Sequence, residues 1–221
     1  MQRLRVPIVK AIGEASSRLP ADDPTIRTTL KRDLEETFAD EPETLIVEEM
    51  GLGHGATRVD VAVVNGHLHG FEVKSDRDTL RRLPRQAHIY NKVLDYATLV
   101  LGPHHVEPGM RLVPDWWGIK LVEKLADGSV RLADVRVPRL NQSVDGLSVA
   151  KLLWRHEALR VLEELGALSG FRSKTRLLLY ARLVEAVSLN WLRARVRQQL
   201  RARLNWRPLA RPASYGGLGQ L

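Results

Sequence analysis

Apolar residues recur along the first half of the chain with two different spacings. The first stripe repeats every three or four positions, the spacing of one helix face, at Ile26, Leu30, Leu34 and Phe38. Runs that alternate apolar and polar residues, or are apolar throughout, are typical of β-strands and occupy residues 44–49, 58–64, 68–75 and 97–101. Residues 78–96 predict a second helix, with Pro84 near its first turn or at a kink. The predicted order is therefore helix, three strands, helix, strand.

The second half changes from strand patterns to helix patterns. Residues 117–125 and 130–137 flank Asp127–Gly128 and predict a β-hairpin. A linker follows, and leucine-rich helical stripes begin at Lys151. We expect an α/β fold in which a mixed β-sheet is flanked by helices, with a C-terminal all-α module. The expected division is a core at 22–140, a helical module at 150–206, and extensions at 1–21 and 207–221.

Composition narrows the class of protein. Hydrophobic residues make up 44% of the 221 residues and charged residues 27%, which is typical of a globular protein. Cysteine is absent, which excludes disulfides and thiolate metal sites. No apolar run approaches the roughly 20 residues that a membrane helix needs. We therefore expect no membrane partner and a cytoplasmic location.

The positive charge is concentrated at the C-terminal end of the chain. The formal net charge is +8; residues 151–221 carry 14 Lys/Arg and 4 Asp/Glu, whereas residues 1–150 carry 20 and 22. Such a basic segment favours a polyanionic partner, so we expect DNA, with RNA as the alternative. The charge pattern leaves open a protein partner or a homo-oligomer. A basic face that only contacts solvent is the other interpretation.

Three residues on two neighbouring strands are candidates for chemistry. Glu72 and Lys74 lie two apart on one strand, so both side chains leave the same face, and Asp60 lies on the preceding strand. Two carboxylates without a soft ligand suit Mg²⁺ or Mn²⁺, and the lysine could hold a water molecule or offset negative charge. Glu49 is the expected third metal ligand, with Glu48 as the alternative. The competing interpretation is a set of ion pairs.

A longer pattern includes these residues. Asp60, Glu72-Val73-Lys74 and Gln86-Ala87-His88-Ile89-Tyr90 together resemble the PD-(D/E)XK (restriction-endonuclease-like) superfamily. The Gln-x-x-x-Tyr element is similar to that of RecB-type and lambda-exonuclease-type nucleases. Residues 49–118 resemble a family of uncharacterised bacterial proteins of that superfamily, although Val59 stands where the superfamily motif has proline.

The resemblance implies a function and roles for the matching residues. It implies a metal-dependent nuclease, that is, a magnesium-dependent deoxyribonuclease that hydrolyses DNA phosphodiester bonds. Its catalytic residues would be Asp60, Glu72, Lys74, Gln86 and Tyr90, and its metal ligands Glu49, Asp60 and Glu72. The alternative is a catalytically silent DNA-binding or scaffold protein of the same fold, in a repair or defence complex.

Basic residues in two regions are candidates for nucleic-acid binding. The first group opens the helix after the third strand and comprises Arg77, Arg81, Arg82 and Arg85. The second group lies in the C-terminal module and comprises Arg172, Lys174, Arg176, Arg193, Arg197 and Arg201. Residues 162–183 are faintly similar to a SAP-type DNA-binding module. The alternative for the second group is a packing or dimerisation element.

Overall fold

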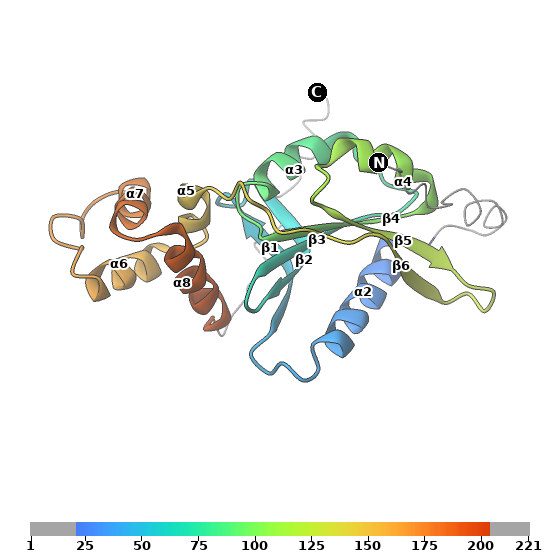
Figure 1. Cartoon of the computed structure of the whole chain (residues 1–221), viewed down its shortest axis with the longest axis horizontal. Coiled ribbons are helices and arrows are strands. Elements are labelled where there is room, and N and C mark those ends of the chain that lie inside the picture. The colour runs from blue at the N-terminus through green and yellow to red at the C-terminus, as the bar shows by residue number, and fades with distance from the viewer. Residues whose placement is uncertain (1–20, 204–221) are drawn as a thin grey trace, which may run out of the picture.

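The computed structural model describes residues 21–203, and its centre is a six-stranded mixed β-sheet (Figure 1). The strands follow one another in chain order across the sheet; β3, β4 and β5 are parallel, and the other neighbours are antiparallel. The strands are β1 (Leu45–Leu52), β2 (Thr57–Val64), β3 (Leu68–Lys74), β4 (Tyr96–Leu101), β5 (Gly118–Lys124) and β6 (Val130–Arg136). The helices are α2 (Asp23–Thr37), η1 (Leu80–Arg82), α3 (Leu83–Tyr90), η2 (Pro103–His105), α4 (Val106–Leu112), α5 (Gly146–Ala150), α6 (Arg155–Glu164), α7 (Arg176–Ala186) and α8 (Leu189–Arg201).

Local sequence explains where the first helix begins and which face it buries. The Asp22 side chain accepts the backbone N–H of Thr25 at 3.1 Å, and Pro24 stands in the first turn, where its missing N–H costs nothing. The buried residues Ile26, Leu30 and Leu34 form the predicted stripe. This stripe packs on one face of the sheet, in a cluster with the side chains of Val61, Val63, Phe71, Val73, Val100 and Val122.

The opposite face of the sheet is covered by α3 and α4, so the sheet lies between two helical layers (Figure 1). Leu83, Ala87 and Tyr90 of α3 are buried against the strands there. The same apolar cluster continues into α5–α8 without a break. The α/β class, the flanking helices and the C-terminal helical region are therefore confirmed.

One predicted helix is shorter than expected. The segment 78–96 forms only η1 and α3, because Pro84 stands at the start of α3 and a turn follows Tyr90. Helix α4, which precedes β5, was not predicted. The expected extensions, 1–21 and 207–221, lie outside the described residues apart from residue 21.

Ion pairs attach the C-terminal helices to the sheet. The buried carboxylate of Asp95, which precedes β4, pairs with Arg193 and Arg197 of α8 and accepts the backbone N–H of Leu68 at 2.7 Å. The expected boundary, residues 140–150, includes most of the segment between β6 and α5 and also α5 itself, which the sequence analysis placed in a linker. Among residues 21–203, no helix is long and apolar enough to cross a membrane.

Candidate functional site

The predicted site forms where β2 and β3 separate. Backbone pairing between the two strands ends at Val61 and Phe71. Beyond that point the Asp60 side chain takes the place of a backbone partner, because its Oδ2 accepts a hydrogen bond from the backbone N–H of Val73 at 2.7 Å. The Asp60 carboxylate is therefore buried and fixed beside β3.

Glu72 is buried at the centre of a polar network that joins β3 to α3. Its Oε1 accepts hydrogen bonds from the Lys74 ammonium and from Gln86 Nε2, the latter at 2.5 Å. Its Oε2 accepts one from the Tyr90 hydroxyl at 2.5 Å. Gln86 and Tyr90 can reach the same carboxylate because they lie one helical turn apart. The structure thus brings together four of the predicted site residues, with Asp60 beside them.

Arg27 of α2 was missed by the sequence analysis and is the cation nearest Asp60. Its guanidinium donates to Asp23 at 2.8 Å, to Glu49 at 2.6 Å and to Asp60 Oδ1 at 2.6 Å. Three carboxylates from three elements therefore share one cation. In the sequence, Arg27 directly follows Ile26 of the apolar stripe, which indicates that it lies near the buried side of the helix. The local pattern does not reveal its partner Asp60, which is 33 residues away.

The electrostatics of the site reflect burial of charge. Burial and the charge of Glu72 raise the pKa of Asp60 to about 7, although Arg27 and the Val73 N–H oppose this rise. Burial also raises the pKa of Tyr90, and the nearby Glu72 adds to the effect. For Arg27, burial acts to lower the pKa, but Asp60, Glu49 and Asp23 together raise it above its usual range.

The carboxylates as placed do not fit a divalent cation. Arg27 and the Val73 N–H occupy the two oxygens of Asp60, and three donors occupy those of Glu72. Glu49 has a left-handed backbone with φ of 53° and faces Arg27 and Arg58, while its alternative, Glu48, pairs with Lys31. Among residues 21–203, no three His, Cys, Asp or Glu side chains are grouped so that they could hold a metal ion. Magnesium would require these cationic side chains to move, and its presence stays a prediction.

The two groups of predicted nucleic-acid residues differ in their surroundings. Arg77, Arg81, Arg82 and Arg85 are exposed, and none of their side chains forms an ion pair or hydrogen bond with another described residue. In the C-terminal group, Arg193 and Arg197 bind Asp95, Arg172 binds Glu163 and Arg201 binds Glu43. Only Lys174 and Arg176 of that group lack an ion pair within the part of the chain that the structure describes.

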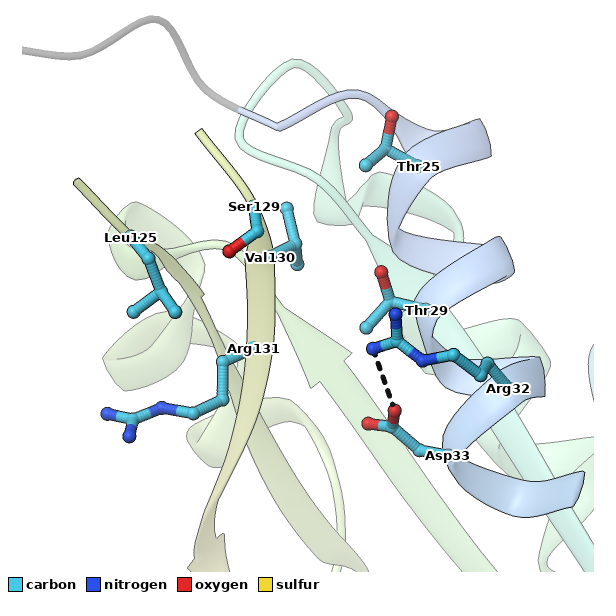
Figure 2. Close-up of a pocket in the computed structure, with 8 residues that line it drawn as sticks. All are labelled: Thr25, Thr29, Arg32, Asp33, Leu125, Ser129, Val130 and Arg131. Carbon is cyan, nitrogen blue, oxygen red and sulfur yellow. Dashed lines mark hydrogen bonds and ion pairs between the residues drawn. The ribbon is translucent and has the colours of Figure 1, made fainter. Parts of the chain in front are cut away.

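A pocket of about 500 Å³ lies between α2 and the β5–β6 hairpin, away from this network (Figure 2). Its lining residues are Thr25, Thr29, Arg32, Asp33, Leu125, Ser129, Val130 and Arg131. Both arginines are already paired, Arg32 with Asp33 at 3.2 Å and Arg131 with Glu123 at 2.5 Å. The pocket contains none of the predicted site residues.

Comparison with known proteins decides the family. The family model described as bacteriophage P4 protein cII matches residues 21–208. The chain belongs to the bacteriophage P4 protein cII family. Protein cII of Enterobacteria phage P4 is 38% identical over 61 residues, which are 28% of this cII-family chain and 23% of that relative's length. A solved protein of unknown function from Silicibacter pomeroyi covers 70% of this chain and 100% of its own, with 19% identity and a TM-score of 0.39.

The cII-family match corrects the resemblance drawn from the motif. The assignment to the PD-(D/E)XK superfamily was wrong, and so was the DNA-hydrolysing function, active or silent, that depended on it. The reason is physical: an acid, a Glu-x-Lys strand and a Gln-x-x-x-Tyr helix also describe the buried hydrogen-bond network of this cII-family chain. Whether the chain catalyses a reaction is tested neither by the fold nor by these relatives, so that expectation stays a prediction.

Proposed function

We propose that the chain binds nucleic acid through phosphate contacts from a basic stripe that runs from η1 along α3 into the turn after it. The basic stripe consists of Arg81, Arg85, His88 and Lys92, which are all exposed and follow one another at intervals of four, three and four residues. The buried Leu83, Ala87, Tyr90 and Leu94 repeat the same intervals two positions later. A shift of two residues is about half a helical turn, so the stripe faces solvent while the apolar set faces the sheet.

The observation that supports this proposal is that the arginines of the stripe make no ion pair among the described residues, so they are free to bind a phosphate. Arg81 and Arg85, like their neighbours Arg77 and Arg82, make no ion pair with any described residue. Arginine presents a planar fork of donors that matches phosphate, and phosphate contacts dominate the affinity of such complexes. Arg193 and Arg197, by contrast, would have to release the buried Asp95 before they could bind a phosphate.

The buried polar network has a role in this proposal. Gln86 and Tyr90 face the sheet from the same helix that carries Arg85, and both donate to Glu72. Charge-assisted hydrogen bonds to a buried carboxylate hold a helix in one orientation more firmly than apolar contact alone. In this proposal, Asp60, Glu72, Lys74, Gln86 and Tyr90 keep the stripe in place. A protein that binds nucleic acid must share a compartment with it, so the proposal keeps the expected cytoplasmic location.

Fluorescence anisotropy with a labelled DNA duplex of about 20 base pairs tests the proposal. The double variant Arg81→Ala/Arg85→Ala should bind at least about tenfold more weakly than wild type, because two phosphate contacts are lost. The matched control is Arg32→Ala/Arg131→Ala, which removes the same charge from exposed, paired arginines beside α2 and β6 and should bind like wild type.

Equal weakening in both variants would show that only net charge matters and would reject the stripe as the site. Unchanged affinity in the Arg81→Ala/Arg85→Ala variant would reject it as well. An unlabelled RNA duplex of equal length, used as a competitor, shows which nucleic acid is preferred. RNA offers the same phosphate charge in a different groove geometry.

A further inference from the structure

We propose that the nucleic-acid path does not end at Lys92 but continues across the β1–β2 loop onto the helical module, through Lys151 and Arg176. This inference rests on the proposed function. The basic track is defined as the basic stripe together with His54, Lys151, Lys174 and Arg176. The sequence analysis expected four of these residues to bind nucleic acid, namely Arg81, Arg85, Lys174 and Arg176. It did not expect this of the other four, His54, His88, Lys92 and Lys151.

The first connection joins the end of the stripe to α5. The backbone N–H of Asp145, the residue that caps α5, donates to the carbonyl oxygen of Lys92 at 2.9 Å. Lys151 stands at the other end of this five-residue helix. The pKa of the Asp145 carboxyl is lowered mainly by its hydrogen bonds from Ser148, and Lys151 and Lys92 add to the effect. Lys92 is therefore bonded through its backbone to the residue that caps one end of α5, and Lys151 stands at the other end of that short helix.

The second connection is the loop between β1 and β2. A side-chain carbon placed on Gly53 would lie 3.9 Å from Cγ2 of Ile89, so the loop passes close to α3. The next residue, His54, has a left-handed backbone with φ of 59°, and its ring stacks on Tyr180 of α7 with centroids 5.6 Å apart. The loop thus spans the distance between the two helices.

The positive charges of Arg176 and Lys151 act on His54 at this crossing. Burial lowers the pKa of the imidazole, and Arg176 and then Lys151 lower it further. At neutral pH the ring is therefore uncharged, and its two nitrogens can donate and accept hydrogen bonds. Arg176 lies one helical turn before Tyr180 on α7, so it is close to the place where the His54 ring stacks. A cation beside a polar ring is suited to a phosphodiester backbone.

The charges along the track are mostly uncompensated. Lys92, Lys151, Lys174 and Arg176 make no ion pair within 4.0 Å among residues 21–203, and Asp145 is the opposing carboxylate between the two lysines. The stripe alone spans about 11 residues or 16 Å, which corresponds to about five base pairs. A partner that also reaches Arg176 must be longer, so the track predicts that affinity depends on the length of the nucleic acid.

The experiment compares DNA hairpins with stems of about 8 and about 20 base pairs, again by anisotropy. The variant Lys151→Ala/Arg176→Ala should weaken binding of the long stem at least about tenfold and leave binding of the short stem within about twofold of wild type. The variant Arg81→Ala/Arg85→Ala should weaken binding of both. Circular dichroism checks that each variant is folded.

The failures of the two proposals can be told apart. If Arg81→Ala/Arg85→Ala weakens both stems but Lys151→Ala/Arg176→Ala weakens neither, the track is wrong and the stripe stands. Equal weakening of both stems by Lys151→Ala/Arg176→Ala would also overturn the track. If neither variant changes binding of either stem, the proposed function itself fails. Polyglutamate that displaces the long stem at a lower concentration than unlabelled DNA of equal charge does would overturn nucleic acid as the partner in favour of an acidic protein.

Discussion

At the residue scale, Arg27 is the side chain on which the charge balance of the buried site depends. It is the cation bonded to Asp60, and Asp60 lies beside a second buried carboxylate, Glu72. A buried charge that loses its partner is strongly destabilising, whereas a neutral replacement of the whole pair is tolerated. Substitutions of Arg27 or Asp60 should therefore change the stability of the fold more than they change binding.

The variant Arg27→Met should lower the free energy of unfolding by about 3 kcal/mol at a pH above the pKa of Asp60, about 7, because the ionised carboxylate would lose its cation. Urea unfolding followed by circular dichroism measures this. Arg32→Met on the same helix is the control, and it should cost no more than about 0.5 kcal/mol because the Arg32 side chain is 62% exposed. Adding Asp60→Asn to Arg27→Met should restore part of the lost stability. Equal losses of stability in Arg27→Met and Arg32→Met would contradict this role of Arg27.

Asp60 should also make stability depend on pH. Its pKa rises to about 7 on folding, from an ordinary value near 3.8, so the folded state binds the proton more tightly than the unfolded state. The contribution of this residue to stability is therefore largest at low pH and declines as pH rises from about 4 to about 7.

Unfolding of wild type and Asp60→Asn at several pH values isolates this effect. The stability of wild type relative to the variant should decrease through that window and stay constant above it. A relative stability that increases with pH would mean that Arg27 dominates and that the carboxyl is held ionised.

At the scale of elements, the hydroxyl of Tyr90 joins α3 to β3. Tyr90→Phe should destabilise the protein by about 2 kcal/mol, because a hydrogen bond to a buried charged group is lost. Tyr180→Phe is a matched control. Tyr180 is equally buried, but its hydroxyl donates to the neutral carbonyl of Leu153 at 2.8 Å, and its loss should cost about 1 kcal/mol. A smaller loss for Tyr90→Phe than for Tyr180→Phe would contradict the anchoring role.

Most elements could be predicted because their patterns are local. The alternation in β2 and the stripe in α2 are each set within one segment, and so is the convergence of Gln86 and Tyr90 on one face. The partners of Arg27 and of Asp95 could not be predicted, because each pairing joins segments far apart in the chain and depends on how layers stack. The roles of Arg193 and Arg197 could not be read from charge, since a basic helix can bind a buried carboxylate instead of a polyanion.

At the scale of the whole molecule, the chain belongs to the cII family and not to the nuclease superfamily, so the buried polar network is interpreted as part of a cII-family fold. The helical module packs on the same core as the sheet and is held by Asp95, so the two parts of the basic track keep a fixed relation. Two of the C-terminal arginines, Arg193 and Arg197, are used for this attachment, and others pair with glutamates inside the module. The lysines and arginines of the basic track make no ion pair among residues 21–203, and they lie instead along η1 and α3, at the end of α5 and at the start of α7.

The salt dependence of binding tests the central claim most directly. The affinity for a DNA duplex of about 20 base pairs is measured by anisotropy over a range of salt concentrations, for wild type and for Arg81→Ala/Arg85→Ala. Each phosphate contact contributes about 0.9 to the slope of log affinity against log salt, so the variant's slope should be shallower by about 2. Equal slopes for the two proteins would show that these arginines do not contact phosphate, and the proposed function would then be wrong.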